Sequence, residues 1–385
     1  MKKMLLILPA LLLLNACQQG HSETSRAFQG DEQAVGNNPD YWILTDPAAD
    51  LANYLRTTVS IEGRTKLMMF NHQQNELLIY DTKSRELEKK IAYDHQGPNA
   101  VNAVFPSGGI HVISKDSILL YSQLQSTLYF SDMDGTIFKK TRIQNDSIGF
   151  GSVFIYSHLA LTKDKAWMQS LPHTIGEFAT EDYENRPNMF GSIDLKTGAT
   201  KEYLFDYPEI YQGKDISQQL KMAHILYNAS IDKFIISFPL SHDIYVTDFK
   251  GYTKSYPAKS SLVGAPLETV KNRKDVGPSA ITSHYYWIND KYGQLIYDPV
   301  SGYYLREAEK GLSEANFEKR DFATAKEIIV LDKDFNQVAT IPHHGGSLLY
   351  HFFEGNRIFW NADFTEYNYD RENEDTIYFE QKRFY

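Results

Sequence analysis

Short apolar runs recur along the chain and are separated by turn-forming residues. The clearest of these runs are Leu77–Tyr80, Ile118–Tyr121, Phe234–Phe238, Leu295–Tyr297, Ile328–Leu331 and Arg357–Trp360. Runs of this length between turn residues are typical of β-strands. Helical periodicity is best at 46–56, 209–222 and 307–317, which we expect in connections. The 26 Tyr and 22 Phe residues also favour a pleated, half-buried surface.

A second pattern repeats along the chain: an apolar strand, an aspartate, a short turn that often contains glycine, and another strand. The aspartates are Asp81, Asp132, Asp194, Asp248, Asp298 and Asp332. An aspartate in this position accepts hydrogen bonds from turn amides two residues further on, and a glycine supplies a positive φ. The pattern predicts hairpins, and its intervals fit four-stranded antiparallel propeller blades with their loops.

The expected fold is an all-β, six-bladed β-propeller; seven blades or a pair of β-sandwiches are the alternatives. The expected blades are 57–94, 109–143, 153–205, 223–258, 280–342 and 347–385. The last blade is one strand short, with its third strand near Thr376–Phe379. We expect Tyr41–Thr45 to complete it, because closing the ring removes exposed sheet edges.

Two similar turns lie three predicted blades apart. Gly97-Pro98-Asn99 precedes the second blade, and Gly277-Pro278-Ser279 precedes the fifth. Proline and glycine there are explained by a turn into an inner strand. In a six-bladed ring the two turns would face each other, which leaves Asn99 and Ser279 free to point into the central pore.

The N-terminus has the pattern of an export signal. Lys2 and Lys3 precede an apolar run, Met4–Leu14, that is too short to span a bilayer. Leu14-Asn15-Ala16-Cys17 resembles a lipobox, which implies a signal peptide over 1–16 and lipidation of Cys17. Residues 17–40 are polar and predict a flexible tether, followed by one propeller domain over 41–385. Gln18 after the cysteine resembles the pattern of outer-membrane lipoproteins, with the leaflet left open.

The second predicted blade resembles those of NHL-type and TolB-like six-bladed propellers. The residues that carry this resemblance are Phe105-Pro106, Gly109–Val112, Ile118–Tyr121 and Asp132–Gly135. The whole chain, with its lipobox, is similar to a group of exported lipoproteins of unknown function from gut-type Gram-negative bacteria. That second likeness rests on Tyr297–Pro299, Tyr303–Arg306 and Ile328–Phe335. It implies a place in the cell envelope and no particular activity.

Charge and motifs exclude several classes of function. The net charge of −10 disfavours nucleic acid as a partner. The chain contains no Gly-x-Ser-x-Gly elbow, phosphate-binding loop, dinucleotide fingerprint or His-Glu-x-x-His motif. Asp132-x-Asp134-Gly135 begins like a calcium loop but lacks the later acidic ligands. We therefore expect no cofactor and no metal.

The expected working surface is the side of the ring that carries the crossovers between blades. These crossovers are 92–109, 144–152, 206–222, 259–279 and 343–346. Long, unequal loops on a rigid scaffold are where binding is usually built. The candidate ligand-binding residues are His95, Gln96, Asn99, Ser279, His343 and His344. They line one axial pocket in this hypothesis; the alternative is that they hydrogen-bond neighbouring loops.

The sequence favours a non-enzymatic binding or scaffold module for a glycan, peptide or protein, attached to the membrane through its lipid. The alternative is an enzyme that acts on glycans or peptides at the axial pore. Tyr and Trp pairs are compatible with sugar stacking, but packing between blades is their more usual role. Ser117, Ser147 and Thr376 lie in Asp-Ser/Thr-Ile triplets, a pattern that resembles O-glycosylation sites of exported proteins in such bacteria.

Overall fold

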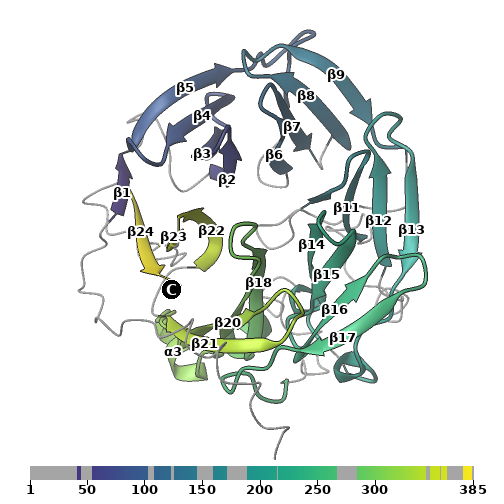
Figure 1. The fold of residues 1–385 in the computed structure, drawn as a ribbon, viewed down its shortest axis with the longest axis vertical. Helices are drawn as coiled ribbons and strands as arrows, with labels where there is room; N and C mark the ends of the chain where they lie inside the picture. Colours follow the sequence, from purple (N-terminus) through teal and green to yellow (C-terminus); the bar gives the residue numbers. More distant parts are fainter. Residues whose placement is uncertain are drawn as a thin grey trace, which may run out of the picture.

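The fold is a ring of β-sheets, seen in a computed structural model (Figure 1). The structure describes residues 41–44, 54–102, 108–122, 125–144, 159–170, 189–214, 216–266, 284–343, 347–355, 357–361 and 376–383. Within these ranges the strands form six four-stranded sheets, and all paired strands are antiparallel. The expected all-β propeller with four-stranded antiparallel blades is therefore confirmed.

The sheets follow one another along the chain. The first sheet contains β2 (Tyr54–Ile61), β3 (Arg64–Asn71), β4 (Glu76–Asp81) and β5 (Glu86–Ala92). The second contains β6 (Gly108–Ser114), β7 (Ser117–Ser122), β8 (Thr127–Asp132) and β9 (Ile137–Arg142). The third contains β10 (Ala160–Leu161), β11 (Lys165–Ser170), β12 (Met189–Asp194) and β13 (Thr200–Leu204).

The fourth and fifth sheets have the same order. The fourth contains β14 (His224–Asn228), β15 (Lys233–Ser237), β16 (Asp243–Thr247) and β17 (Thr253–Pro257). The fifth contains β18 (Lys291–Tyr297), β19 (Tyr304–Glu309), β20 (Lys326–Leu331) and β21 (Gln337–His343). The closing sheet contains β22 (Ser347–Glu354), β23 (Arg357–Asn361), β24 (Thr376–Arg383) and β1 (Tyr41–Leu44).

The two ends of the described chain meet in the closing sheet. β1 pairs antiparallel with β24, from Tyr41 opposite Phe379 to Leu44 opposite Thr376. Figure 1 shows the purple β1 beside the yellow β24. The expected completion of the last blade by Tyr41–Thr45 is confirmed by this pairing. It covers an edge of β24 that would otherwise be open.

The predicted aspartate turns are confirmed in every sheet in which they were expected. Each of the six aspartates accepts hydrogen bonds from backbone amides of its own turn. Asp332 is typical, because its Oδ1 accepts from the amides of Asp334 at 2.9 Å and Asn336 at 2.8 Å. These local bonds satisfy the backbone N–H groups of the turn and fix the register between the strands before and after it.

Apolar side chains fill the spaces between neighbouring sheets. Trp167 and Phe190 of the third sheet pack with Phe234 of the fourth, for example. Ile43 of β1 and Phe379 of β24 pack with Leu67 of the first sheet, so the core continues across the closure. The aromatic residues at these positions have the packing role that the sequence favoured.

Two of the expected helices are wrong in extent. Residues 209–222 contain two short 3₁₀ helices, η3 (Glu209–Tyr211) and η4 (Gln218–Lys221). Residues 307–317 divide between β19 and α3 (Glu314–Lys319), whose N-cap Ser313 accepts a hydrogen bond from the Asn316 amide. The third, 46–56, lies mostly outside the described residues, and its end belongs to β2.

Among the described residues, none of the helices is long and apolar enough to cross a membrane.

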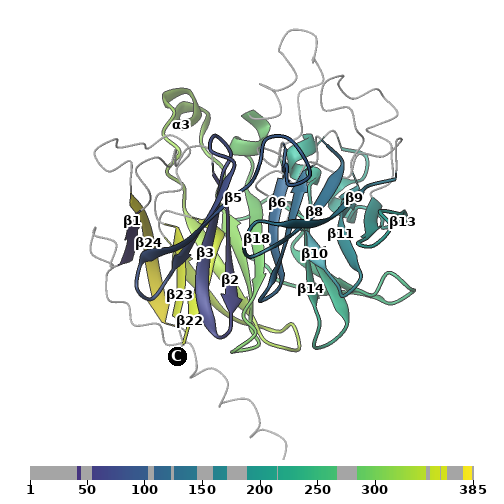
Figure 2. The ribbon, with the colours of Figure 1, turned by 90° about the horizontal axis from the view of Figure 1, so that it is seen from above.

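The fifth sheet also begins later than expected. Its first strand starts at Lys291, and residues 284–288 are helical. Because strands alternate in direction, the connection from β19 to β20, which contains α3, lies on the same side as the entry to β18. We call this the crossover side and the opposite side the hairpin side. Figure 2 shows α3 projecting beyond the strands on the crossover side.

Candidate functional site

The predicted ligand-binding residues divide between two regions of the ring. His95 and Gln96 are exposed between β5 and β6, and the half-buried Asn99 accepts a hydrogen bond from the Ile137 amide of β9 at 3.3 Å. His343 is buried at the end of β21. Ser279 and His344 lie outside the described residues. Asn99 therefore makes a hydrogen bond within its own sheet region, as in the alternative that the candidate residues hydrogen-bond neighbouring segments. The shared axial pocket stays a prediction.

His343 belongs to a row of charged side chains that crosses the fifth sheet at its crossover end. In register, Lys291 lies opposite Glu309, Glu309 opposite Lys326, and Lys326 opposite His343. We call these four residues the charged row. Side chains directly opposite on antiparallel strands share a face, so opposite charges alternate along it.

The charged row is buried because its face of the sheet is covered by the closing sheet. The His343 ring meets Trp360 of β23 edge to face, with 5.4 Å between ring centroids. The side chains of Glu309 and Lys326, the two middle members, are 12% and 14% exposed, so they too are largely removed from solvent. Charges in such a place interact more strongly than surface charges do.

Glu307 joins the charged row from the same strand as Glu309. Its carboxylate lies 3.3 Å from His343 Nε2 and 4.0 Å from Lys326 Nζ. Burial alone would raise its pKa, but the hydrogen bond with His343 and the charges of Lys326 and His343 lower the pKa to about 2. A Cβ at Gly293, beside this bulge in β18, would lie 2.6 Å from Glu307 Oε2, so a larger residue there would displace the Glu307 carboxylate.

Lys291 differs from the other members because its ammonium makes no hydrogen bond of good geometry with a described residue. The residue is 2% exposed, and Nζ lies 3.4 Å from Glu309 Oε2, which is long for a charge-assisted hydrogen bond. Nζ also lies 4.6 Å from the ring centre of Tyr286 and 5.5 Å from that of Trp287. Burial lowers the pKa of Lys291, and the charge of Glu309 opposes that effect. An ammonium has three donors, and none of them meets a well-placed acceptor among the described residues.

Arg306, on the opposite face of the same sheet, shows what a satisfied buried cation looks like. Its guanidinium donates to Ser237 Oγ and to the carbonyl oxygens of Phe238, Ser241, His242 and Ala258. It also stacks on Tyr292, 3.6 Å from the ring centre. Burial lowers its pKa to about 10. Arg306 is therefore occupied in joining the fourth and fifth sheets, and Lys291 is not so occupied.

Two further polar atoms in or beside the charged row, Gln294 Oε1 and His343 Nδ1, are buried with no hydrogen-bond partner among the residues that the structure describes. Native structures contain few such atoms, and each needs an explanation. No group of His, Cys, Asp and Glu suited to a metal ion occurs among the described residues. The site thus offers hydrogen-bond donors, acceptors and aromatic surface to a ligand.

The sequence reasoning missed Lys291, Glu307, Glu309 and Lys326. The available signal was the density of charge in strands that also carry large apolar residues, as in Tyr304-Leu305-Arg306-Glu307-Ala308-Glu309. In a strand that is covered on one face only, charged residues mixed with apolar ones indicate that the other face points to solvent. Both faces of this strand are covered, so its charges are buried.

The expected modification sites are placed only in part. Ser117 is the half-buried first residue of β7, and its Oγ accepts from Ser114 Oγ at 3.1 Å. Thr376 is the half-buried first residue of β24. Ser147 and the expected lipidation site Cys17 lie outside the described residues. Glycosylation and lipidation stay predictions.

Comparisons with known proteins agree with this fold. A family model described as "Domain of unknown function (DUF4221)" matches residues 30–339. A crystal structure of a DUF4221 member from Bacteroides vulgatus is similar, with 20% identity, 89% of this chain and 96% of that chain covered, and a TM-score of 0.69. A Bacteroides fragilis protein is similar with 12% identity, 90% and 96% coverage, and a TM-score of 0.50. No curated protein sequence matches the chain.

Proposed function

The chain belongs to the DUF4221 family, and because that family is described without an activity, we propose a function from the geometry of the site. The protein is a binding module of the cell envelope that holds its ligand without converting it. The ligand occupies the crossover side of the ring, at the end of the fifth sheet. The observation that carries this proposal is Lys291 Nζ, which is buried without a well-placed hydrogen-bond acceptor in the described part of the chain.

A buried ammonium is costly unless it is paired and hydrogen-bonded. The contact of Lys291 with Glu309 supplies charge, but at 3.4 Å it is long for a charge-assisted hydrogen bond. A ligand that places a carboxylate or hydroxyl oxygen beside Nζ would supply what is missing. Tyr286 and Trp287 would then offer ring surface to the same ligand, as they do to Nζ. This combination suits a glycan or a peptide with an acidic group.

The proposal includes attachment to the membrane. Support comes from the sequence: a basic start, a short apolar run and Leu14-Asn15-Ala16-Cys17. A lipidated Cys17 and the polar residues 18–40 would hold the ring away from the membrane on a tether. The outer membrane is the favoured location.

The test uses the full chain carrying Cys17→Ser, so that it can be purified without detergent. Glycan and peptide pools are screened by thermal shift and, in parallel, for product formation. We expect a ligand that raises the melting temperature and is recovered unchanged. Lys291→Met should weaken that ligand about tenfold or more, because a charge-assisted hydrogen bond is lost.

The matched control is Lys333→Met, which removes an exposed lysine from the hairpin side of the same sheet. It should leave affinity unchanged, and the melting curves of both variants report whether folding is intact. Turnover of the ligand would refute the binding proposal in favour of an enzyme. Undiminished binding by a folded Lys291→Met variant would refute this site.

A further inference from the structure

A hollow lies between the second and third sheets, far along the ring from the charged row. It occupies about 660 Å³ between the end of β9 and the β12–β13 hairpin. Polar side chains that line it are Lys140, Thr141, Arg142, Gln144, Lys196 and Thr197. Ile143 is the apolar member of the lining, and none of the described lining residues is acidic.

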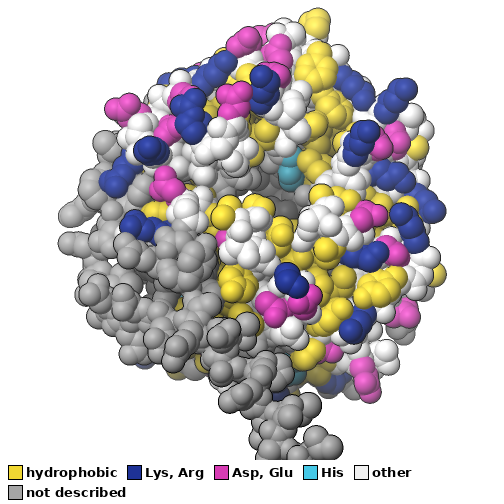
Figure 3. Space-filling view, viewed as in Figure 1, with side chains coloured by type: hydrophobic (Ala, Val, Ile, Leu, Met, Phe, Trp, Pro, Cys, Tyr) yellow, Lys and Arg dark blue, Asp and Glu magenta, His cyan; other side chains and the backbone are white. Residues whose placement is uncertain are grey.

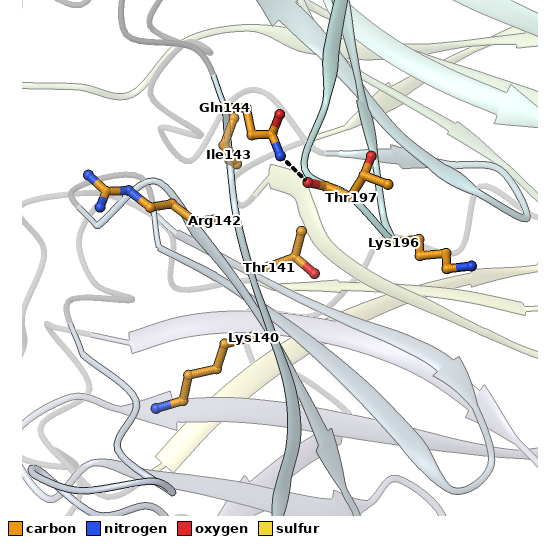
Figure 4. Close-up of a pocket in the computed structure, with 7 residues that line it drawn as sticks. All are labelled: Lys140, Thr141, Arg142, Ile143, Gln144, Lys196 and Thr197. Carbon is orange, nitrogen blue, oxygen red and sulfur yellow. Dashed lines mark hydrogen bonds between the residues drawn. The ribbon is translucent and has the colours of Figure 1, made fainter.

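The walls of the hollow are fixed by contacts between the two sheets. Gly198, at φ 75°, lies against the carbonyl oxygen of Arg142 so closely that no Cβ fits there. The Gln144 amide donates to Gly198 O at 2.9 Å, and Gln144 Nε2 donates to Thr197 O at 2.9 Å. Figure 4 shows the second of these bonds. Such a surface is preorganised, so a ligand loses little affinity to ordering it.

Positive charge is concentrated at this junction in a chain of net charge −10. The cations are Lys139, Lys140, Arg142, Lys196 and Lys201, and within the described part of the chain none lies within 4.0 Å of a carboxylate. Figure 4 shows Lys140 and Arg142 leaving β9 on one side and Lys196 projecting on the other. Figure 3 shows Lys and Arg gathered along the rim over β9, β12 and β13.

We propose that this hollow binds a short acidic saccharide, whose carboxylates or sulfates lie across the end of β9 between the cations on its two sides. The volume is in the range of pockets for small ligands, roughly 300–1,000 Å³. Thr197 and Gln144 add hydroxyl and amide groups that hydrogen-bond sugar hydroxyls. A long nucleic acid is disfavoured by the net negative charge, and a membrane surface would not need a hollow.

The experiment measures binding of tetragalacturonate by calorimetry to the full chain carrying Cys17→Ser. We expect a Kd below about 1 mM at low salt, and weakening as sodium chloride is raised. Arg142→Glu and Lys196→Glu should each weaken binding about fivefold or more. Lys250→Glu is the matched control, because Lys250 occupies the position of Lys196 in the hairpin of the fourth sheet.

Fully methyl-esterified tetragalacturonate keeps the sugars and removes the charges, so it should not bind. Equal binding of the ester, equal weakening by Lys250→Glu, or no binding of the acid would each overturn the proposal. Sodium sulfate binding as tightly as the saccharide would show a site for bare anions only, and would overturn the saccharide assignment. Loss of tetragalacturonate binding in Lys291→Met, with Arg142→Glu binding like wild type, would place the saccharide at the fifth sheet and overturn this proposal.

Discussion

Ile43 lies directly opposite Ile377, and this pair joins the two ends of the described chain within one sheet. Both side chains are buried, at 0% and 2% exposure, in the cluster shared with the first sheet. The ring is therefore closed by a strand contributed from the N-terminal side of the domain. Sheet edges at this position are covered only while β1 and β24 remain paired.

Ile43→Asp should open this closure. A charge buried without a partner, together with lost apolar contacts, should lower the free energy of unfolding by about 3–5 kcal/mol. Val300→Asp, at a residue 73% exposed, should change it by no more than about 0.5 kcal/mol. Urea unfolding measures both. Deletion of 375–385 should likewise cause insolubility or a large loss of stability, and a truncated chain that melts like the full one would refute the closure.

Arg306→Met should lower the free energy of unfolding, because it removes the hydrogen bonds between the fourth and fifth sheets. The carbonyl oxygens of Phe238, Ser241 and Ala258 would lose a buried donor. We expect a loss of about 3–5 kcal/mol. Arg306→Lys keeps the charge but not the planar fork, so it should not restore stability fully. Arg64→Met, at an exposed position, is the control, and a wild-type unfolding midpoint for Arg306→Met would contradict the assigned role.

The hairpin turns of this fold could be predicted because the residues that determine each turn lie next to one another in the sequence. The aspartate turns were visible in the sequence since Asp and Gly have specific conformational and hydrogen-bonding roles within four residues. The pairing of Tyr41–Thr45 with Thr376–Phe379 followed from a strand count that left one sheet incomplete. Both expectations are confirmed by backbone pairing.

The charged row could not be predicted, because its burial depends on packing between the fifth sheet and the closing sheet, which no local sequence pattern shows. Lys291 and His343 stand at opposite edges of the fifth sheet, and Trp360 covers His343 from the closing sheet. Nothing near Glu307 or Glu309 in the sequence shows that both faces of β19 are covered. Helical periodicity predicted a helix over 307–317, whereas packing keeps Tyr304–Glu309 extended.

Asp298→Ala should destabilise the hairpin that begins the fifth sheet. Asp298 is 2% exposed and accepts from the amides of Val300 and Ser301 and from Ser301 Oγ. Loss of these acceptors should cost about 1–2 kcal/mol. Asp298→Asn keeps one side-chain oxygen and should lose less. Chemical unfolding of the two variants checks this order, and the reverse order would show that the charge, not the turn, is what matters.

Cys17→Ser should release the protein from membranes. If Cys17 is the acylated residue, its lipid supplies the membrane affinity, at about 0.8 kcal/mol for each buried methylene. Detergent phase partitioning should move the variant wholly to the aqueous phase, with the melting temperature unchanged because Cys17 precedes the ring. Ser22→Ala, a few residues further along the expected tether, should partition like wild type. A Cys17→Ser variant that stays in the detergent phase would reveal a different anchor.

Glu307 should make the stability of the ring depend on pH under acidic conditions. Its pKa is lowered from 4.5 to about 2, with burial opposing the shift and His343 and Lys326 producing it. A carboxyl whose pKa is lower in the folded state stabilises the fold fully above its unfolded pKa. That contribution, about 3 kcal/mol, is lost as the pH falls from about 4.5 to about 2.

The contribution of Glu307 can be isolated from that of other carboxyls such as Asp81, whose pKa is also lowered to about 2 by Lys66 and by turn amides. The free energy of unfolding is measured for wild type and Glu307→Gln at pH 7 and again near pH 3. At pH 7 wild type should be the more stable, since the variant leaves His343 and Lys326 without their carboxylate. The difference should shrink at the lower pH, because protonation makes the wild-type side chain resemble the amide. Glu318→Gln, at an exposed position on α3, should show no such change. A difference between wild type and Glu307→Gln that stays constant with pH would mean that Glu307 is not held as a carboxylate by the charged row.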